Sequence, residues 1–148
     1  MQPGCGWFVR DGRDLVVFGY GPWLLSNAWH AAEELERTAG ITTRVINLPW
    51  LNRIDLAWLQ DAIGDRRTIV LLDNHYVRGG QGEMIAAAIA ELALEPSRTV
   101  RRAGVTALPE CGTNDEVLAY HRLDRASLLE VFRAAVSGDR SGAVVSPA

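Results

Sequence analysis

The stretch Leu15-Val16-Val17-Phe18-Gly19-Tyr20-Gly21-Pro22 decides the fold of this chain. Its first five residues form a continuous apolar run, which is typical of a strand buried on both faces of a parallel sheet. Gly21 and Pro22 then begin a helix, because proline is tolerated in the first turn, where its missing N–H needs no partner. A buried strand that turns directly into a helix predicts an α/β protein.

The same alternation of strand and helix continues in both directions. Runs of strand length recur at Thr43–Leu48, Thr68–Leu72 and Thr99–Val105, and Trp7–Val9 could add an edge strand. The run at Thr68 is expected to end where Asp73 begins a polar segment. We therefore expect a three-layer α/β/α sandwich around a mostly parallel sheet of about five strands, with one edge strand that could be antiparallel.

Helix boundaries are marked by capping residues, glycine and proline. Asp55 and Asp124 are placed as N-caps, and Thr113 with Glu116 forms a capping box. Gly40 is expected to end the first helix, and Pro96 to end the helix that follows the glycine turn at 79–82. The apolar positions at helical spacing are Leu25, Ala28, Ala32, Leu35 and Ala39 in the first helix, and Ile85, Ala86, Ile89, Leu92 and Ala93 in the later one.

Length and composition suit one soluble globular domain. The 148 residues show neither an internal repeat nor a linker, so we expect one domain over residues 1–138 and a mobile polar tail over 139–148. The net charge of −3 argues against nucleic-acid binding. Cys5 and Cys111 have neither metal-ligand spacing nor a disulfide pattern. Without an apolar leader or a membrane-length run, a cytoplasmic protein is expected.

Four stretches, in this order and spacing, resemble a known family. They are LVVFGYGP (Leu15–Pro22), RVINLPWLNRI (Arg44–Ile54), DNHYVRGGQG (Asp73–Gly82) and ECGTNDE (Glu110–Glu116). Together they resemble the C-terminal domain shared by transketolases, deoxyxylulose phosphate synthases and the beta subunits of 2-oxo-acid dehydrogenases. The likeness extends from about Phe8 to Val136. The family often has glutamate where Asp73 stands and proline where Arg53 stands.

The resemblance implies a domain without a cofactor site of its own. In this family, thiamine diphosphate and magnesium are held between two other domains, through a Gly-Asp-Gly motif followed by an asparagine. Here Gly64-Asp65 and Gly138-Asp139 are each followed by arginine instead. The resemblance therefore implies an oligomer with chains that carry the diphosphate-binding and pyrimidine-binding domains, and with the cofactors bound there rather than by this chain alone.

A candidate ligand site lies beyond two strand ends. In open α/β sheets, ligands bind outside the carboxyl ends of strands. If the strand at Leu15 lies between its two apolar neighbours, its end faces the polar segment of the third strand. An anion could bind there, at the starts of two helices. The simpler interpretation, which we favour, is that the glycines make tight turns. The candidate ligand-binding residues are Gly19, Gly21, Asp73, His75, Gly80 and Gly82.

His75 is the side chain with the most chemical potential, since it could carry a proton near neutral pH. The alternative is a capping or interface histidine, because no nucleophile or second histidine adjoins it in sequence. We name no catalytic residue beyond this candidate, and no metal ligands. Five tryptophans in so short a chain suggest some exposure, so Trp50 and Trp58 are our candidates for a protein interface.

The leading hypothesis is an assembly domain or subunit of a split, thiamine-diphosphate-dependent transketolase-like enzyme. The complete complex would transfer a two-carbon ketol or acyl unit, and this chain alone would not be catalytic. One alternative is a free-standing module that binds a small anion or has a regulatory role on the same fold. A small independent enzyme is a further alternative, although no nucleophile and base stand together in the sequence.

Overall fold

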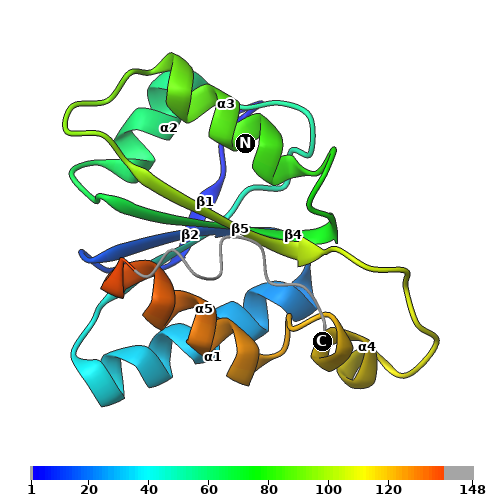
Figure 1. The fold of residues 1–148 in the computed structure, drawn as a ribbon. Coiled ribbons are helices and arrows are strands. Elements are labelled where there is room, and N and C mark those ends of the chain that lie inside the picture. Colours follow the sequence, from blue (N-terminus) through cyan, green and yellow to red (C-terminus); the bar gives the residue numbers. More distant parts are fainter. Residues whose placement is uncertain (1, 139–148) are drawn as a thin grey trace.

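A five-stranded sheet forms the middle layer of the fold in this computed structural model, which describes residues 2–138 (Figure 1). The strands are β1 (Trp7–Arg10), β2 (Leu15–Gly19), β3 (Thr43–Asn47), β4 (Thr68–Tyr76) and β5 (Thr99–Val105). They lie in the order β1-β3-β2-β4-β5, with only β1 antiparallel to its neighbour. The predicted fold is confirmed, including the antiparallel edge strand. The predicted tail, residues 139–148, lies outside the described residues.

Helices cover both faces of this sheet. They are α1 (Pro22–Ala39), α2 (Leu56–Ile63), α3 (Gln81–Glu91), α4 (Asn114–Tyr120) and α5 (Arg125–Ser137). α1 and α5 pack on one face, with α4 beside them, and α2 and α3 pack on the other (Figure 1). The layers follow from right-handed crossovers between parallel strands, which place successive helices on opposite faces when the chain reverses its direction across the sheet.

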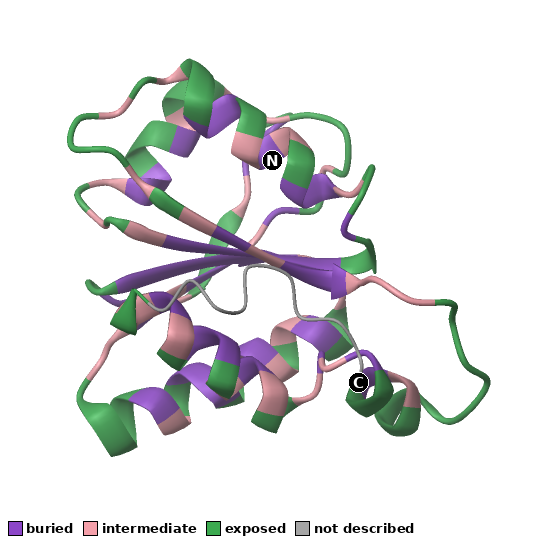
Figure 2. Cartoon of the chain, in the orientation of Figure 1, coloured by how far each residue is buried: buried purple, intermediate pink, exposed green. Residues whose placement is uncertain are grey.

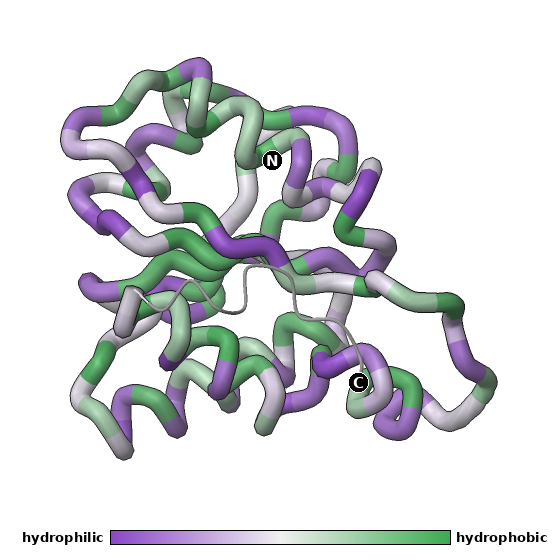
Figure 3. Tube along the Cα trace, viewed as in Figure 1, coloured by the Kyte–Doolittle hydropathy of each residue, from purple (hydrophilic) through white to green (hydrophobic). Residues whose placement is uncertain are grey.

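The core consists of two apolar clusters separated by the sheet. Leu15 and Val17 of β2 face α1 and α5, whereas Val16 and Phe18 face α2 and α3. Successive side chains of a strand point to opposite faces, so the continuous apolar run at β2 serves both clusters. Figure 2 shows the buried strands between partly exposed helices, and Figure 3 shows the same central strands as hydrophobic.

The predicted helix caps are confirmed. The carboxylate of Asp55 accepts a hydrogen bond from the amide of Trp58 at 2.8 Å, and Asp124 accepts one from Ala126 at 3.2 Å. Thr113 and Glu116 form the reciprocal capping box that starts α4. These side chains satisfy amide groups that a helix start leaves without partners within the helix.

Two helix predictions need correction. α3 ends at Glu91 rather than continuing to Ala93, because Ala93 adopts a left-handed backbone (φ 44°) that turns the chain toward β5. In α1, Leu24 is fully buried, while Ala39 is exposed. Ala28, Ala32 and Leu35 are buried as predicted, so the predicted face is correct in the middle of the helix and wrong only in its first and last turns.

β4, the strand expected at Thr68–Leu72, is longer than its apolar run predicted. β4 continues through Asp73 to Tyr76, although its pairing with β5 is irregular between Leu72 and Tyr76. Beyond the irregularity, Tyr76 pairs with Val105, and the amide of Val77 donates to the carbonyl of Val105 at 3.0 Å. The expected strand end at Leu72 is therefore wrong, because pairing with β5 holds the polar residues in extended form. Asp73 consequently lies inside the sheet.

Candidate functional site

The structure brings together the two chain segments that the sequence predicted would meet. At the carboxyl edge, where the four parallel strands end, the residues after β2 lie beside the last residues of β4. The hydroxyl of Tyr20 lies 3.5 Å from an oxygen of Asp73. A Cβ atom at Gly21 would lie 3.7 Å from the side-chain amide nitrogen (Nδ2) of Asn74. Both contacts follow from the parallel pairing of β2 with β4.

Asp73 is the central residue of this edge. Its side chain is fully buried, and one of its oxygens accepts a hydrogen bond from the amide of Gly82 at 3.0 Å. Burial raises the pKa of the Asp73 carboxyl, while the hydrogen bonds from Gly82 and Gln81 act in the opposite direction. The carboxylate thus satisfies amide groups at the start of α3, where the N-cap Gly80 has no side chain to do so.

Two of the three glycines in the turn at 79–82, Gly80 and Gly82, are explained by this carboxylate. A Cβ atom at Gly80 or at Gly82 would lie 2.7 Å from an oxygen of Asp73. From the neighbouring strand, a Cβ at Gly104 would lie 3.0 Å from the Cβ of Asp73. Each of these positions therefore has to lack a side chain. An anion bound at the start of α3 would compete with a carboxylate that the protein itself supplies, so this geometry favours the structural role of the glycines.

Tyr20 was not among the residues that the sequence indicated. Burial, together with the negative charge of Asp73, raises the pKa of the Tyr20 phenol to about 12. Tyr20 is therefore a neutral hydrogen-bond donor throughout the physiological range. The sequence predicted that the strand end carrying Tyr20 would face Asp73, but it did not single out the phenol as the group that makes the contact.

Gln81 is a second residue that sequence reasoning missed. Its buried side-chain amide donates to the carbonyl of Leu48 at 2.7 Å and to the carbonyl of Trp50 at 3.0 Å. These bonds fasten the start of α3 to the segment that follows β3. The only signal in the sequence is a long polar side chain between two glycines, which also fits a solvent-exposed turn.

His75 does not share the buried environment of Asp73. It is exposed, its Nδ1 atom lies 3.4 Å from the carbonyl of Tyr76, and its ring meets the Tyr76 ring edge-on. Asp73 and His75 belong to the same strand, but only the side chain of Asp73 is hydrogen-bonded to α3. A role for His75 in proton transfer remains a prediction.

The two candidate interface tryptophans are half-buried. The indole nitrogen of Trp50 donates to the carbonyl of Cys5 at 3.0 Å, and Trp58 packs edge-on against Phe18 with ring centroids 6.3 Å apart. Both therefore have packing roles within the domain, and a further role at an interface remains a prediction. Trp7 and Trp23 are the exposed tryptophans, which agrees with the expectation that five could not all be buried.

The residues of this edge do not fit a magnesium-bound diphosphate. In residues 2–138, histidine, cysteine and carboxylate side chains do not gather into a group of three that could hold a metal ion. Asp73, the single buried carboxylate among residues 2–138, already accepts a hydrogen bond from Gly82. Magnesium prefers several oxygen ligands together with phosphate oxygens.

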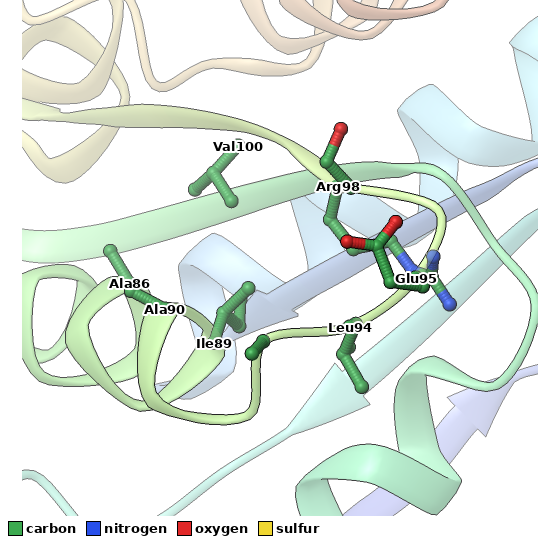
Figure 4. A pocket seen from close by; sticks show the side chains of 9 residues that line it. Ala86, Ile89, Ala90, Leu94, Glu95, Arg98 and Val100 are labelled. Carbon is green, nitrogen blue, oxygen red and sulfur yellow. The ribbon is translucent and has the colours of Figure 1, made fainter.

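A separate hollow lies at the opposite edge of the sheet. It has a volume of about 390 Å³ and is lined by the second half of α3 and the start of β5 (Figure 4). Ile89, Leu94 and Val100 form its apolar wall, and Arg98 and Glu95 lie at its rim (Figure 4). It is open and contains no arrangement of a nucleophile with a base.

In residues 2–138, none of the helices combines the length and apolar character that crossing a membrane requires.

Fold and edge together define an open α/β domain with a buried carboxylate at the carboxyl ends of its parallel strands. The family model described as "Transketolase, C-terminal domain" matches residues 4–128. The chain belongs to the transketolase C-terminal domain family. The resemblance inferred from the four sequence stretches is therefore confirmed.

Individual relatives extend this result. A transketolase family protein of Sinorhizobium fredii is 36% identical over 98 residues, which are 66% of this chain and 28% of that protein. Human transketolase is 28% identical over 138 residues, 93% of this chain and 22% of that protein. A solved "Split gene transketolase, inactive beta4 tetramer" has a TM-score of 0.82 at 26% identity, covering 95% of this chain and 45% of that one.

A transketolase of Pichia stipitis shows the fold alone, with a TM-score of 0.69 at 15% identity over 91% of this chain and 18% of that one. This chain spans well under a third of the length of the curated relatives, from 12% to 28%. Most of each relative therefore has no counterpart in these 148 residues.

Proposed function

We propose that this chain is the C-terminal assembly domain of a split transketolase-type enzyme and is not catalytic alone. Its role is to bind a companion chain that carries the diphosphate-binding and pyrimidine-binding domains. The complete complex transfers a two-carbon ketol or acyl unit, with thiamine diphosphate and magnesium held by the companion. Such cofactors carry out the bond-breaking chemistry, and the protein supplies binding and orientation.

One observation carries this proposal: the family match covers residues 4–128, while the chain spans at most 28% of the length of the curated relatives. A domain that accounts for less than a third of an enzyme needs the remainder for the reaction. The split-gene relative, which is named an inactive beta4 tetramer, provides a precedent for transketolase polypeptides made in separate pieces.

The geometry of the carboxyl edge supports a structural role over the anion-binding alternative. The Asp73 carboxylate accepts the hydrogen bond of the Gly82 amide and excludes side chains at Gly80 and Gly82. A small anion would have to approach a buried negative charge, which opposes its binding.

The proposal is tested by assembly. The chain is mixed with the same organism's transketolase-type polypeptide that lacks this domain, and the mass of the product is measured by light scattering after gel filtration. We expect a complex that contains both chains in a fixed ratio. Two separate peaks at all concentrations from 1 to roughly 100 µM would contradict the proposal, since a constitutive subunit interface reaches affinities well below this range.

A further inference from the structure

Large apolar side chains are exposed beyond the ends of all four parallel strands. Trp23 follows β2 and Leu51 follows β3, and they are 59% and 56% exposed. Tyr76, the last residue of β4, is 39% exposed, and Leu108, which follows β5, is 82% exposed. Single apolar residues on a surface need no explanation, but several on one edge mark an interaction surface.

Hydrogen bonds and close contacts hold these four strand ends together. The amide of Leu48 donates to the carbonyl of Gly19 at 3.0 Å, which joins the end of β3 to that of β2. Gly21 approaches Asn74, and the pairing of Tyr76 with Val105 joins β4 to β5. The exposed side chains therefore rise from one continuous carboxyl edge. The loop from β5 to α4 projects from this side of the molecule and is exposed (Figures 1 and 2).

Polar contacts tie together much of the opposite edge, which also contains the open hollow of Figure 4. Arg66 donates to the carbonyl of Gly12 at 2.7 Å, and the carboxylate of Asp14 accepts from both the amide and the hydroxyl of Thr42 at 2.7 Å. Arg98 donates to the carbonyl of Gly64 at 2.9 Å. The two ends of the sheet thus differ in exposure. The apolar side chains at the hollow, Ile89, Leu94 and Val100, are buried or half-buried, whereas the carboxyl end carries the exposed side chains of Trp23, Leu51, Tyr76 and Leu108.

The start of the domain lies at this same edge. The carbonyl of Gly4 accepts from the amide of Asp55 at 3.0 Å, and the carbonyl of Cys5 accepts from Trp50. Trp7 is then paired with Asn47, the last residue of β3. In longer relatives this domain is the C-terminal part, so the preceding polypeptide joins near the position of Gly4. That preceding part is therefore attached beside the segment that follows β3, which carries the exposed Leu51.

The geometry points to the carboxyl edge as the docking surface for the companion chain that carries the transketolase-type catalytic domains. Trp23, Tyr76 and Leu108 are its apolar anchors. This inference rests on the proposed function and names the surface that performs it. Aromatic side chains at the centre of an interface commonly dominate the binding free energy, and polar groups around them exclude water.

Matched variants test the surface. Trp23→Ala and Leu108→Arg alter the carboxyl edge. The controls, Ala39→Arg and Ala90→Arg, place arginine on exposed apolar positions near the last residues of α1 and α3, away from that edge. The Kd for the companion chain is measured by calorimetry. We expect each edge variant to raise Kd at least about tenfold and their combination about 100-fold, with the controls within about twofold. Thermal unfolding of each variant establishes that it is folded, as exposure of these residues predicts.

The outcomes separate this inference from the proposal on which it depends. If the wild-type chains bind but the edge variants bind equally well, the docking surface is elsewhere and the assembly role stands. If the wild-type chains do not bind, both ideas are wrong. If the edge variants instead abolish self-association of this chain without affecting the companion, the edge is an interface between two copies, and the inference is overturned.

Discussion

The carboxylate of Asp73 lies 3.0 Å from the backbone amide of Gly82, nine residues later in the chain, and is fully buried. This contact joins the middle layer of the fold to the start of α3. It also explains why the turn between them is rich in glycine, because Cβ atoms there would collide with the carboxylate. A motif that could bind a phosphate is thus occupied by a group of the protein itself.

Asp73→Ala should destabilise the domain by about 2 kcal/mol. The substitution leaves the buried amide of Gly82 without its acceptor, and an unsatisfied buried donor costs about 1–3 kcal/mol. Asp73→Asn is the control, since its side-chain oxygen can still accept this bond. The free energy of unfolding in urea measures both effects. Equal stability of the alanine variant and the wild type would show that the contact contributes nothing.

Stability should also depend on the pH through Asp73. Burial raises the pKa of Asp73 above its ordinary value of 3.8. At pH values between the pKa of the unfolded state and the raised pKa of the folded state, the folded state therefore binds more protons than the unfolded state. The contribution of Asp73 to stability is therefore present at low pH and is lost as the pH rises through this range. Asp11, Asp14 and Glu83 have lowered pKa values and act in the opposite direction.

The difference between wild type and Asp73→Asn isolates this contribution. We expect the wild type to gain stability relative to the asparagine variant as the pH is lowered from 7 toward 4. Urea unfolding of both proteins across this range provides the measurement. A constant difference would mean that Asp73 has the same affinity for protons in both states.

Gly82→Ala should reveal the steric link to Asp73. Alanine is intrinsically the better helix former by about 1 kcal/mol, but its Cβ would lie 2.7 Å from the Asp73 carboxylate. We expect a net loss of about 1–2 kcal/mol, in line with overpacking elsewhere. In an Asp73→Ala background the same change should be neutral or stabilising. A double-mutant cycle with no coupling between the two sites would refute the contact.

Trp50→Phe should weaken folding more than it weakens assembly. The indole donates to the carbonyl of Cys5, and a typical hydrogen bond contributes about 0.5–1.5 kcal/mol. The ring otherwise packs against the cluster beneath α2 and α3. We expect about 1 kcal/mol lost in urea unfolding and a Kd for the companion within about threefold. A large rise in Kd with unchanged stability would instead support the interface role predicted from sequence.

The fold could be predicted because its signals are local. The apolar run at Leu15–Phe18 serves two clusters at once, and Asp55 and Thr113 cap the helices that follow them. By contrast, the extension of β4 through Asp73 depends on pairing with β5, and polar side chains conceal it. The contact of Tyr20 with Asp73 likewise joins residues 53 positions apart.

The site could be located from sequence but not interpreted. Glycines after a strand indicate close approach of some group, and the sequence alone does not say whether that group is a ligand or a side chain. Here it is Asp73. The exposed edge residues were missed for a related reason. In the sequence, Trp23 and Leu108 are apolar residues like those of the core, and only the order of the strands in the sheet shows that they lie on one side of the molecule.

The central claim is that turnover requires a second polypeptide, and steady-state ketol transfer tests it most directly. Rates are measured with thiamine diphosphate and magnesium for this chain, for the companion chain and for an equimolar mixture. The account predicts turnover by the mixture at a rate far above the sum of the separate rates, with none from this chain. Ketol transfer by this chain alone, or a mixture no faster than the companion, would contradict it.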